Sequence, residues 1–430
     1  MKQPCFIGID LGTSGCRGIC IDDVGRLLAS ASRPLPPSRH PQDGWSEQHP
    51  GDWWSATLEV LQELQVRTPN HQAQALSADG TSGTLVLTNR QGQPLGPGLM
   101  YDDRRATAEA ELLTRLAPDQ AVLHSPSSSL AKLLWLHQHE GLVPGALALH
   151  QSEWISGQLC DTGGVGDENN CLKLGYDPVQ QCWPTWLNEL PLPHSLFPGV
   201  LAVGMPLGRI SPEITAATGL PSQCQVITGT TDSTAAALAA GLEQPGDALT
   251  SLGSTLVCKI LVDQPLQSAQ YGIYSHRIFG RWLAGGASNS GGAVLRQHFS
   301  DPEIRELSRN LNPERSLCLE YYPLPGPGER FPINDPGMPP RLHPVPKDKA
   351  RFLQGILEGI GRIEVLAYRK LESLGAGYPV RVSTSGGGAT NAYWEKLRQR
   401  LLKRPVRIAA HPQPAYGAAS VARRGAYREG

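Results

Sequence analysis

A turn of small residues beside a carboxylate is the first pattern in this chain that points to chemistry. Alternating apolar residues predict strands over residues 6–11 and 16–21. The turn between them is made only of glycine and hydroxyl residues: Gly12, Thr13, Ser14 and Gly15. Asp10 enters this turn, so that backbone N–H groups would face a polyphosphate and the carboxylate its metal ion. The alternative is an ordinary hairpin whose acid caps the turn, and this segment alone favours it.

The same plan recurs in the second half of the chain. Residues 249–263 predict a short strand, the turn Gly253-Ser254-Thr255 and an apolar strand that ends on an aspartate. Two more turns of small hydroxyl residues, at 78–84 and 228–233, each follow a predicted strand. Such repetition indicates two related halves rather than a solenoid, whose periods are much shorter. Common turn chemistry is the alternative, yet the similarity of the four turns favours one convergent ligand site.

Asp232 is the residue best suited to proton transfer. It follows Thr231 at the start of an alanine-rich helix predicted over residues 231–241, with no basic residue beside it in the sequence. A carboxylate that accepts a proton from a substrate hydroxyl contributes roughly 10²–10⁴ in rate, and phosphoryl transfer needs such a group. The alternative is an acid that only stabilises the helix dipole.

A triple glycine marks a second candidate site. Residues 380–385 predict a strand, Gly386, Gly387 and Gly388 follow it, and a helix begins at Asn391. Glycine lets the backbone approach a bulky anion, and a helix N-terminus offers free N–H groups. The segment matches neither a Walker A loop nor a Rossmann fingerprint. A tight strand-to-helix turn is therefore the alternative.

Further elements are predicted from the spacing of apolar residues. Helices are expected over residues 51–66, 125–139 and 151–159, from Leu353 to Ala367, and from Tyr101–Arg105 onward. The Pro- and Gly-rich stretch 323–346 has little periodicity, which predicts a long surface excursion.

Length and charge narrow the class of protein. A chain of 430 residues exceeds one ordinary core, which favours two domains. With 38 basic and 39 acidic residues, the charge balance indicates no nucleic acid or membrane partner. We find no secretory leader or bilayer-spanning run, and the nine cysteines form no CxxC pair. We expect a reduced, cytoplasmic protein without a structural metal, as a monomer or homodimer.

Five motifs in order make the chain resemble the FGGY carbohydrate kinases, which belong to the ASKHA phosphotransferases. They lie at residues 9–15, 79–84, 229–233, 251–255 and 385–391. The resemblance implies an α/β fold with two actin-like or ribonuclease-H-like domains and a nucleotide and sugar cleft between them. The implied domains are 1–241 for sugar binding and the catalytic base and 242–412 for the nucleotide, with segment 413–430 packing back on the first domain.

The resemblance also implies cofactors, ATP and Mg²⁺, and residues that handle the sugar. Asp10 would hold Mg²⁺ through water, and Asp232 would be the general base. The sugar would be bound by Ser82 and Asp232, with Asp10 and Asp103 at the same site.

The remaining implied residues serve the nucleotide. Thr13 and Ser14 would lie near the transferred phosphoryl group, and Gly253 and Ser254 would cradle the phosphates. The nucleotide pocket would be lined by Gly387, Gly388, Asn391 and Trp394, with Trp394 near the adenine. Trp394 has a structural alternative, because it also completes a helical core stripe with Leu397 and Leu401.

Within the family, the chain looks most similar to a short group of cyanobacterial and plant kinases related to xylulose kinase. The phrases that carry this similarity lie at residues 127–133, 170–176, 285–289 and 328–333. Larger xylulose kinases usually carry Trp-x-Asp-x-Arg where this chain has Tyr101–Arg105, and Met-His where it has Ala78-Asp79. The implied substrate is therefore D-ribulose, phosphorylated to the 5-phosphate.

Three alternatives stay open. A kinase for another ketose or polyol, such as D-xylulose, L-ribulose or glycerol, shares the same motifs. A nucleotide-driven binding protein of the actin or chaperone kind shares the fold but needs no base like Asp232. A sugar sensor without activity is disfavoured by the intact acids at Asp10 and Asp232.

Overall fold

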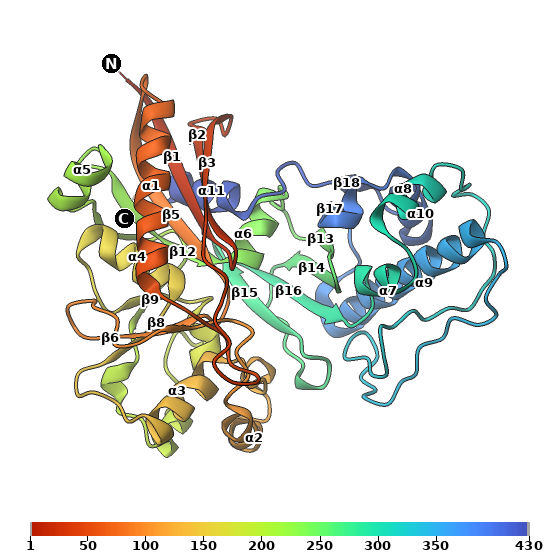
Figure 1. Ribbon diagram of the computed structural model, residues 1–430, viewed down its shortest axis with the longest axis horizontal. Coiled ribbons are helices and arrows are strands. Elements are labelled where there is room, and N and C mark those ends of the chain that lie inside the picture. Colours follow the sequence, from red (N-terminus) through yellow and green to blue (C-terminus); the bar gives the residue numbers. More distant parts are fainter. Residues whose placement is uncertain (1, 428–430) are drawn as a thin grey trace. The chain divides into compact units, whose positions relative to one another are not determined.

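The computed structural model describes residues 2–427, which divide into two compact units (Figure 1). Within these residues, the first unit runs up to Ala239 and also includes His276–Phe279 and the chain from Gln413 onward. The second unit consists of Ala240–Ser275 and Gly280–Pro412. Each unit has its own six-stranded sheet and its own hydrophobic core.

The sheet of the first unit has the order β11-β12-β5-β1-β2-β3. Its strands are β1 (Gln3–Leu11), β2 (Gly15–Asp22), β3 (Leu27–Pro34), β5 (His71–Gly80), β11 (Pro206–Arg209) and β12 (Gln225–Thr231). Strands β1, β2 and β3 form an antiparallel meander, while β5 runs parallel to both β1 and β12. The carboxyl ends of β1, β5 and β12 therefore lie together at one edge of the sheet.

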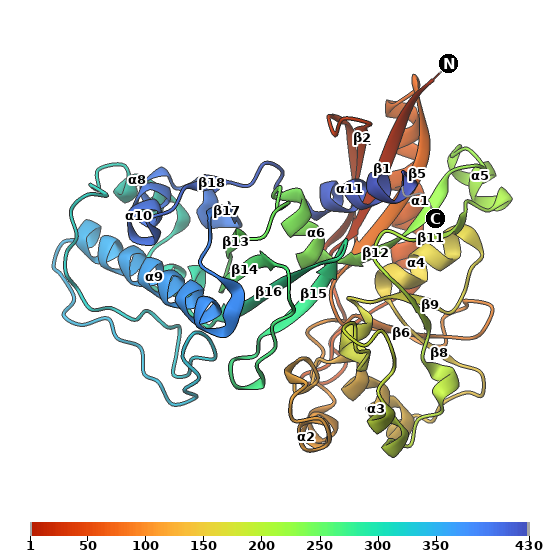
Figure 2. The same ribbon diagram turned by 180° about the vertical axis from the view of Figure 1, so that it is seen from behind.

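Helices cover both faces of this sheet (Figure 2). Helices α1 (Pro50–Arg67) and α4 (Gln151–Cys160) pack on one face, and α6 (Asp232–Ala239) and α11 (Pro414–Ala426) pack on the other. The contact with α11 needs glycine, because a Cβ at Gly8 on β1 would overlap the backbone of Ala415. The C-terminal helix thus belongs to the fold of the first unit.

A smaller four-stranded sheet with the order β4-β7-β6-β8 completes the first unit. The elements of this sheet and its surroundings are β4 (Glu47–Gln48), β6 (Leu85–Thr88), β7 (Gly98–Leu99), β8 (Leu147–His150), α2 (Thr107–Leu116), α3 (Ser129–His139), β9 (Val165–Asp167) and β10 (Gly199–Leu201), while α5 (Pro212–Thr218) packs against α1. The helix expected from Tyr101–Arg105 begins only at Thr107. The intervening turn is held by Asp103, whose carboxylate binds the neighbouring backbone and Arg105.

The sheet of the second unit repeats the plan of the first, with the order β15-β16-β14-β13-β17-β18. Its strands are β13 (Asp247–Leu252), β14 (Leu256–Val262), β15 (Tyr274–Ile278), β16 (Arg281–Ser288), β17 (Arg381–Ser385) and β18 (Val406–Ile408). Strands β13, β14 and β16 form an antiparallel meander, and β17 runs parallel to β13 and β18. The recurrence of the turn motif therefore corresponds to a repeated sheet, as the sequence predicts.

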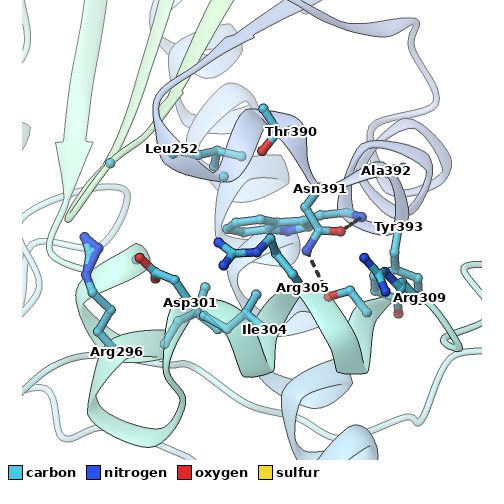
Figure 3. Close-up of a pocket in the computed structure, with 17 residues that line it drawn as sticks. Leu252, Arg296, Asp301, Ile304, Arg305, Arg309, Thr390, Asn391, Ala392 and Tyr393 are labelled. Carbon is cyan, nitrogen blue, oxygen red and sulfur yellow. Dashed lines mark hydrogen bonds between the residues drawn. The ribbon is translucent and has the colours of Figure 1, made fainter.

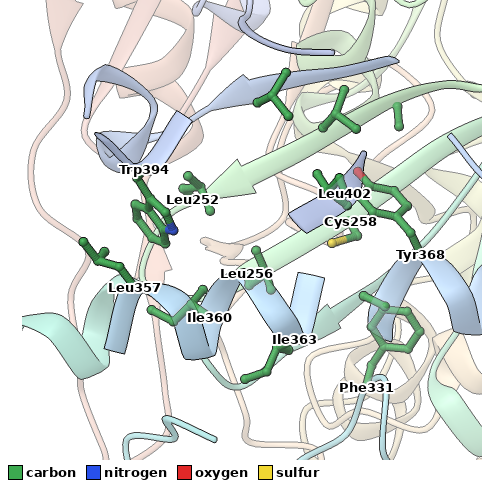
Figure 4. Close-up of a cluster of buried hydrophobic side chains, with 14 of the residues drawn as sticks. Leu252, Leu256, Cys258, Phe331, Leu357, Ile360, Ile363, Tyr368, Trp394 and Leu402 are labelled. Carbon is green, nitrogen blue, oxygen red and sulfur yellow. The ribbon is translucent and has the colours of Figure 1, made fainter. Parts of the chain in front are cut away.

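Four helices pack in the second unit: α7 (Gly292–His298), α8 (Asp301–Ser308), α9 (Lys349–Leu371) and α10 (Ala392–Leu402). The apolar face of α9, with Ile360 and Ile363, packs against strand residues such as Leu256 (Figure 4). Charged residues interrupt the other face, and no helix within residues 2–427 has the length and apolar character needed to cross a bilayer.

The segment 323–346 is a mostly exposed excursion without helices or strands, as expected, but a few of its residues anchor it in the core. Phe331 is buried against Gly286 of β16, where a Cβ would meet its ring (Figure 4). The buried carboxylate of Glu329 accepts hydrogen bonds from Ser288 Oγ at 2.5 Å and from Tyr322 Oη at 2.9 Å. The lack of periodicity in this segment correctly predicts a backbone without helices or strands. The few buried side chains that anchor the segment are not regularly spaced, so the sequence does not reveal them.

Candidate active site

Three carboxylates gather at the carboxyl ends of β1, β5 and β12. Asp10 on β1 lies directly opposite Asp79 on β5, and Asp79 lies opposite Thr230 on β12. Asp232 follows two residues after Thr230 and opens α6. Three of the four small-residue turns recognised in the sequence therefore lie side by side on adjacent strands.

The acids of this cluster carry more negative charge than nearby cations offset. Asp10 is buried, and its pKa is raised to about 6, mainly by burial and further by the charge of Asp232, against the opposing charge of Arg17. Arg17 Nη1 lies 3.4 Å from Asp10 Oδ2, and its side chain is 40% exposed.

Asp79 is the most deeply buried member of the cluster. Burial and the charges of Asp10 and Asp232 raise the pKa of its carboxyl well above the usual range. Among the described residues, its one side-chain hydrogen-bond partner is the carboxyl of Asp10, which raises this pKa further, and no neutral or cationic group donates to its oxygens. A buried carboxylate without such donors is costly for folding and is typical of a site that a ligand completes.

Hydrogen bonds to main-chain atoms hold the turn after β1, so its hydroxyl side chains are not needed to fix the backbone. Gly12 N–H donates to Gly15 O at 3.1 Å, and Thr13 O accepts from Gln48 Nε2 at 2.7 Å. The Thr13 side chain is half-buried and Ser14 is exposed. The predicted phosphoryl-contacting residues therefore lie beside Asp10, on the same turn.

Ser82 lies on the turn after β5, where two lysines that sequence reasoning missed bind the backbone. Lys173 Nζ donates to Ser82 O at 2.7 Å, and Lys132 Nζ donates to Gly83 O at 2.6 Å. Ser82 itself is half-buried. A lysine in a buried segment was the only available signal, since both lie within otherwise apolar stretches of sequence.

Asp103 is not placed as a direct sugar ligand. It has no exposed surface, and its two oxygens accept hydrogen bonds from Ser46 N–H at 2.7 Å and from Arg105 Nε and Nη2 at 2.9 and 2.8 Å. Arg105 also stacks over the Trp45 ring at 3.7 Å. This arrangement argues against the predicted sugar contact and favours a role in fixing the loop around Tyr101.

The second unit holds a cavity of about 430 Å³ between the β13–β14 turn, the triple glycine and helices α7 and α8 (Figure 3). Five of the six residues predicted for the nucleotide in this unit line it: Gly253, Gly387, Gly388, Asn391 and Trp394. The sixth, Ser254, adjoins it through its hydroxyl, which lies 3.4 Å from Arg296 Nη2.

Small residues and a helix cap shape this cavity. A Cβ at Gly388 would lie 2.6 Å from Trp394 Cζ3, so glycine is needed beside the indole. Asn391 caps α10 by accepting from Trp394 N–H at 3.1 Å and also donates to Ser308 Oγ at 2.9 Å. Its side chain therefore fixes the wall of the cavity.

Trp394 lies both at the predicted cavity and in the predicted core stripe, and its contact with the nucleotide stays a prediction. It lines the cavity, and its indole is also buried in the core with Leu252 and Leu357 (Figure 4). Within the described residues its Nε1–H has no acceptor. The ring therefore forms the floor of the cavity rather than a mobile lid.

Sequence reasoning missed the wall that α7 and α8 contribute. Arg296, Asp301, Arg305 and Arg309 point along one side of the cavity (Figure 3). The missed signal is the capping box, in which Ser300 and Glu303 cap α8 reciprocally. Three arginines beside a glycine-rich turn suit a polyanionic ligand.

The protein has a cluster of carboxylates in one repeated α/β unit and a cavity lined by glycines and arginines in the other. Models of the FGGY family of carbohydrate kinases match this chain, the N-terminal domain at residues 5–239 and the C-terminal domain at 248–426. The chain therefore belongs to the FGGY family of carbohydrate kinases, whose members use ATP.

Xylulose kinases are among the relatives of this chain. The xylulose kinase of Escherichia coli K12 is 26% identical, over 97% of this chain and 89% of that protein. The crystal structure of xylulose kinase from Rhodospirillum rubrum is 26% identical, with a TM-score of 0.86 over 97% of this chain and 89% of that one.

A gluconate kinase from Lactobacillus acidophilus has the same fold. It is 20% identical, with a TM-score of 0.86 over 98% of this chain and 89% of that one. Kinases named for different sugars therefore share this fold, and the fold alone does not identify the sugar.

Proposed function

We propose that this chain is an ATP- and Mg²⁺-dependent kinase that transfers the γ-phosphoryl group to the 5-hydroxyl of a ketopentose. The observation that carries the proposal is the cluster of Asp10, Asp79 and Asp232 at three adjacent strand ends. A general base and a cation site within one cluster are what phosphoryl transfer to an alcohol requires of the acceptor side.

Asp232 is the proposed general base. Its position at the start of α6 places it beside the two buried acids, whose pKa values its charge raises. In the reaction it would accept the proton of the 5-hydroxyl while the oxygen attacks the γ-phosphorus. The negative charge of the neighbouring acids does not hinder this proton transfer, but it repels the anionic phosphoryl group, so a cation is needed to balance it.

The residues present fit a magnesium ion. Asp79 offers two buried oxygens, and Asp10 adds a carboxylate that lies beside the half-exposed Arg17. Hard divalent cations prefer such oxygen ligands. Asp10 and Asp79 would hold Mg²⁺, which supplies charge neutralisation for the transferred phosphoryl group when bound.

The nucleotide is proposed to occupy the cavity of the second unit. Gly253 and Ser254 would bind phosphates through their backbone, with Arg296 as a cationic partner. Gly387, Gly388 and Trp394 would contact the base. Thr13 and Ser14 of the first unit would contact the transferred group.

D-Xylulose is the first candidate sugar. The names of the relatives support it better than the D-ribulose expected from the sequence. D-Ribulose is kept as the second candidate because Asp79 and Tyr101 differ from the usual residues of larger xylulose kinases. Tyr101 is 44% exposed, and its pKa is raised by burial, by Asp102 and by the charge of Asp232, which ties it to the catalytic cluster.

The test is ADP release with a panel of D-xylulose, D-ribulose, L-ribulose, ribitol and glycerol at saturating Mg²⁺-ATP. We expect ADP release to depend on a ketopentose, with one of the first two sugars preferred by kcat/KM. ATP hydrolysis that no sugar changes would contradict the proposal and favour a nucleotide-driven binding protein.

A further inference from the structure

Two lysines, the buried Lys132 and the half-buried Lys173, hold consecutive carbonyl groups of the turn that carries Ser82. Lys132, in α3, donates to Gly83 O, Met100 O and Leu99 O at 2.6, 2.9 and 3.2 Å. An ammonium group has three N–H donors, so all donors of Lys132 are used by the backbone. Lys132 is therefore a structural clamp.

Lys173 differs from Lys132 in what its ammonium group still offers. It donates to Ser82 O at 2.7 Å, and among the described residues this is its one hydrogen-bond acceptor. A Cβ at Gly83 would lie 2.8 Å from Lys173 Cδ and 2.9 Å from Nζ, so the side chain lies directly across the turn. Donors that the protein does not use remain for a ligand.

The groups around Lys173 favour the acceptor sugar as the ligand of its ammonium group. Burial lowers the pKa of its ammonium group to about 8, and the charge of Asp232 opposes this shift. Lys173 therefore interacts electrostatically with the proposed base while it contacts the turn of Ser82. A half-buried cation between two residues proposed for the sugar is suited to an oxygen of that sugar.

The chemistry of an ammonium group narrows which oxygen this is. Because the group only donates, it pairs best with an oxygen that only accepts, and a carbonyl oxygen meets that condition. A ketopentose closes its furanose ring through the 5-hydroxyl and the C2 carbonyl. The form with a free 5-hydroxyl is therefore the open chain, which also has the free carbonyl.

We propose that Lys173 donates a hydrogen bond to the C2 carbonyl oxygen of the open-chain ketopentose. The residue then selects ketoses over the corresponding pentitols and binds the form whose 5-hydroxyl is free to react. This inference rests on the proposed function, because it concerns the acceptor of the same reaction.

The test compares a ketopentose with the pentitol made by reducing its carbonyl, in the full chain and in Lys173→Met. We expect kcat/KM for the ketopentose to fall about 10- to 100-fold, the range for a hydrogen bond to a charged group, while the pentitol changes much less. The wild-type preference for the ketose should therefore shrink by that factor, and KM for ATP should stay unchanged. An equal loss on both substrates would overturn the proposal.

Two further variants separate a sugar contact from a shift of the turn. Lys173→Gln keeps a donor near Ser82 O but removes the charge, and it should lose ketose preference like Lys173→Met with less effect on thermal unfolding. Lys132→Met should lower the melting temperature and affect ketopentose and pentitol alike. Loss of ketose preference in Lys132→Met would show that turn position is responsible and would overturn the assignment to Lys173.

The two proposals fail in different ways. If the wild-type chain phosphorylates no ketopentose, the proposed function is wrong. If it does, and Lys173→Met keeps the ketose preference, only the inference about Lys173 is wrong.

Discussion

The two units share a sheet plan but place different side chains at the same point of it. In the first unit Asp10 on β1 lies opposite Asp79 on β5, whereas in the second Ser251 on β13 lies opposite Ser385 on β17. Both pairs adjoin the turn that joins the first two strands of the meander. One unit thus presents charge at this point and the other presents hydroxyls and glycine.

The difference matches the two partners of phosphoryl transfer. Carboxylates suit a metal ion and a proton, but they would repel a polyphosphate, which backbone N–H groups, hydroxyls and arginines bind. A duplicated sheet therefore supplies equivalent positions, and the residue at each position determines its chemistry.

The units also differ in how they treat a buried acid. In the second unit Glu364 is fully buried and paired with Arg398 at 2.6 and 2.7 Å, and it accepts from Thr250 Oγ1. In the first unit Asp79 is equally buried without such donors. Loss of the partner of a paired buried acid destabilises the fold, while a buried acid without a cationic partner is typical of a site that a ligand completes.

The first prediction tests whether Asp232 of the first unit affects the phosphoryl-transfer step and leaves ATP binding unchanged. Asp232→Ala should lower kcat with the preferred sugar by roughly 10²–10⁴, the range for a general base. ATP binding, measured by calorimetry, should persist because the cavity for it is built within the second unit. Near-normal turnover would contradict the assignment of the base.

The second prediction concerns the paired acid of the second unit. Arg398→Met should lower the free energy of unfolding by about 3–5 kcal/mol, because Glu364 is left as a buried charge without its partner. Urea unfolding measures this loss. Replacing both residues, with Glu364→Gln added to Arg398→Met, should recover part of it, and no recovery would contradict the pairing argument.

Much of this organisation could be predicted because it rests on local patterns. Strand periodicity and glycine turns located β1, β13 and β17, and helical spacing located α1 and α9. Asp10 and Asp232 were marked by their positions at strand ends, where local sequence places a side chain reliably.

Other features depend on partners far away in the sequence. The register between strands places Asp79 opposite Asp10, and the carboxylate of Asp103 accepts hydrogen bonds from Arg105 and Ser46 N–H. The wall formed by α8 is a short helix of eight residues, and its apolar stripe is limited to Ile304 and Leu307, which pack against the core. Such features follow from tertiary contacts and not from periodicity.

The third prediction uses the pH dependence of the free energy of unfolding to test whether the acids of the first unit destabilise the fold. The pKa of Asp10 is raised to about 6, so between pH 4 and 6 the folded chain binds more protons than the unfolded chain. The free energy of unfolding should therefore fall as pH rises through this window and stay lower above it. In the absence of divalent cations, Asp10→Asn should reduce this fall, to which the raised pKa of Asp79 also contributes, and stabilise the chain at pH 7.5 by up to about 3 kcal/mol.

Thermal unfolding with EDTA from pH 4 to 7.5 measures this effect. The exposed Asp23→Asn is the control and should leave the pH profile unchanged. Mg²⁺ should raise the melting temperature of the wild-type chain more than that of Asp10→Asn. A lower melting temperature for Asp10→Asn at pH 7.5 would contradict a functional, destabilising acid.

The smallest predicted effect separates packing from ligand contact in the second unit. A Cβ at Gly388 would lie 2.6 Å from Trp394 Cζ3 and 2.9 Å from Leu252 Cβ, whereas a Cβ at Gly387 would meet no protein atom within 4 Å. Gly388→Ala should therefore lower the free energy of unfolding by about 1–3 kcal/mol, as overpacking does, and raise KM for ATP. Gly387→Ala should raise KM for ATP without changing the unfolding midpoint, because only the nucleotide would meet the added methyl group. Equal stability and equal KM in both variants would show that the triple glycine serves neither the indole nor the nucleotide.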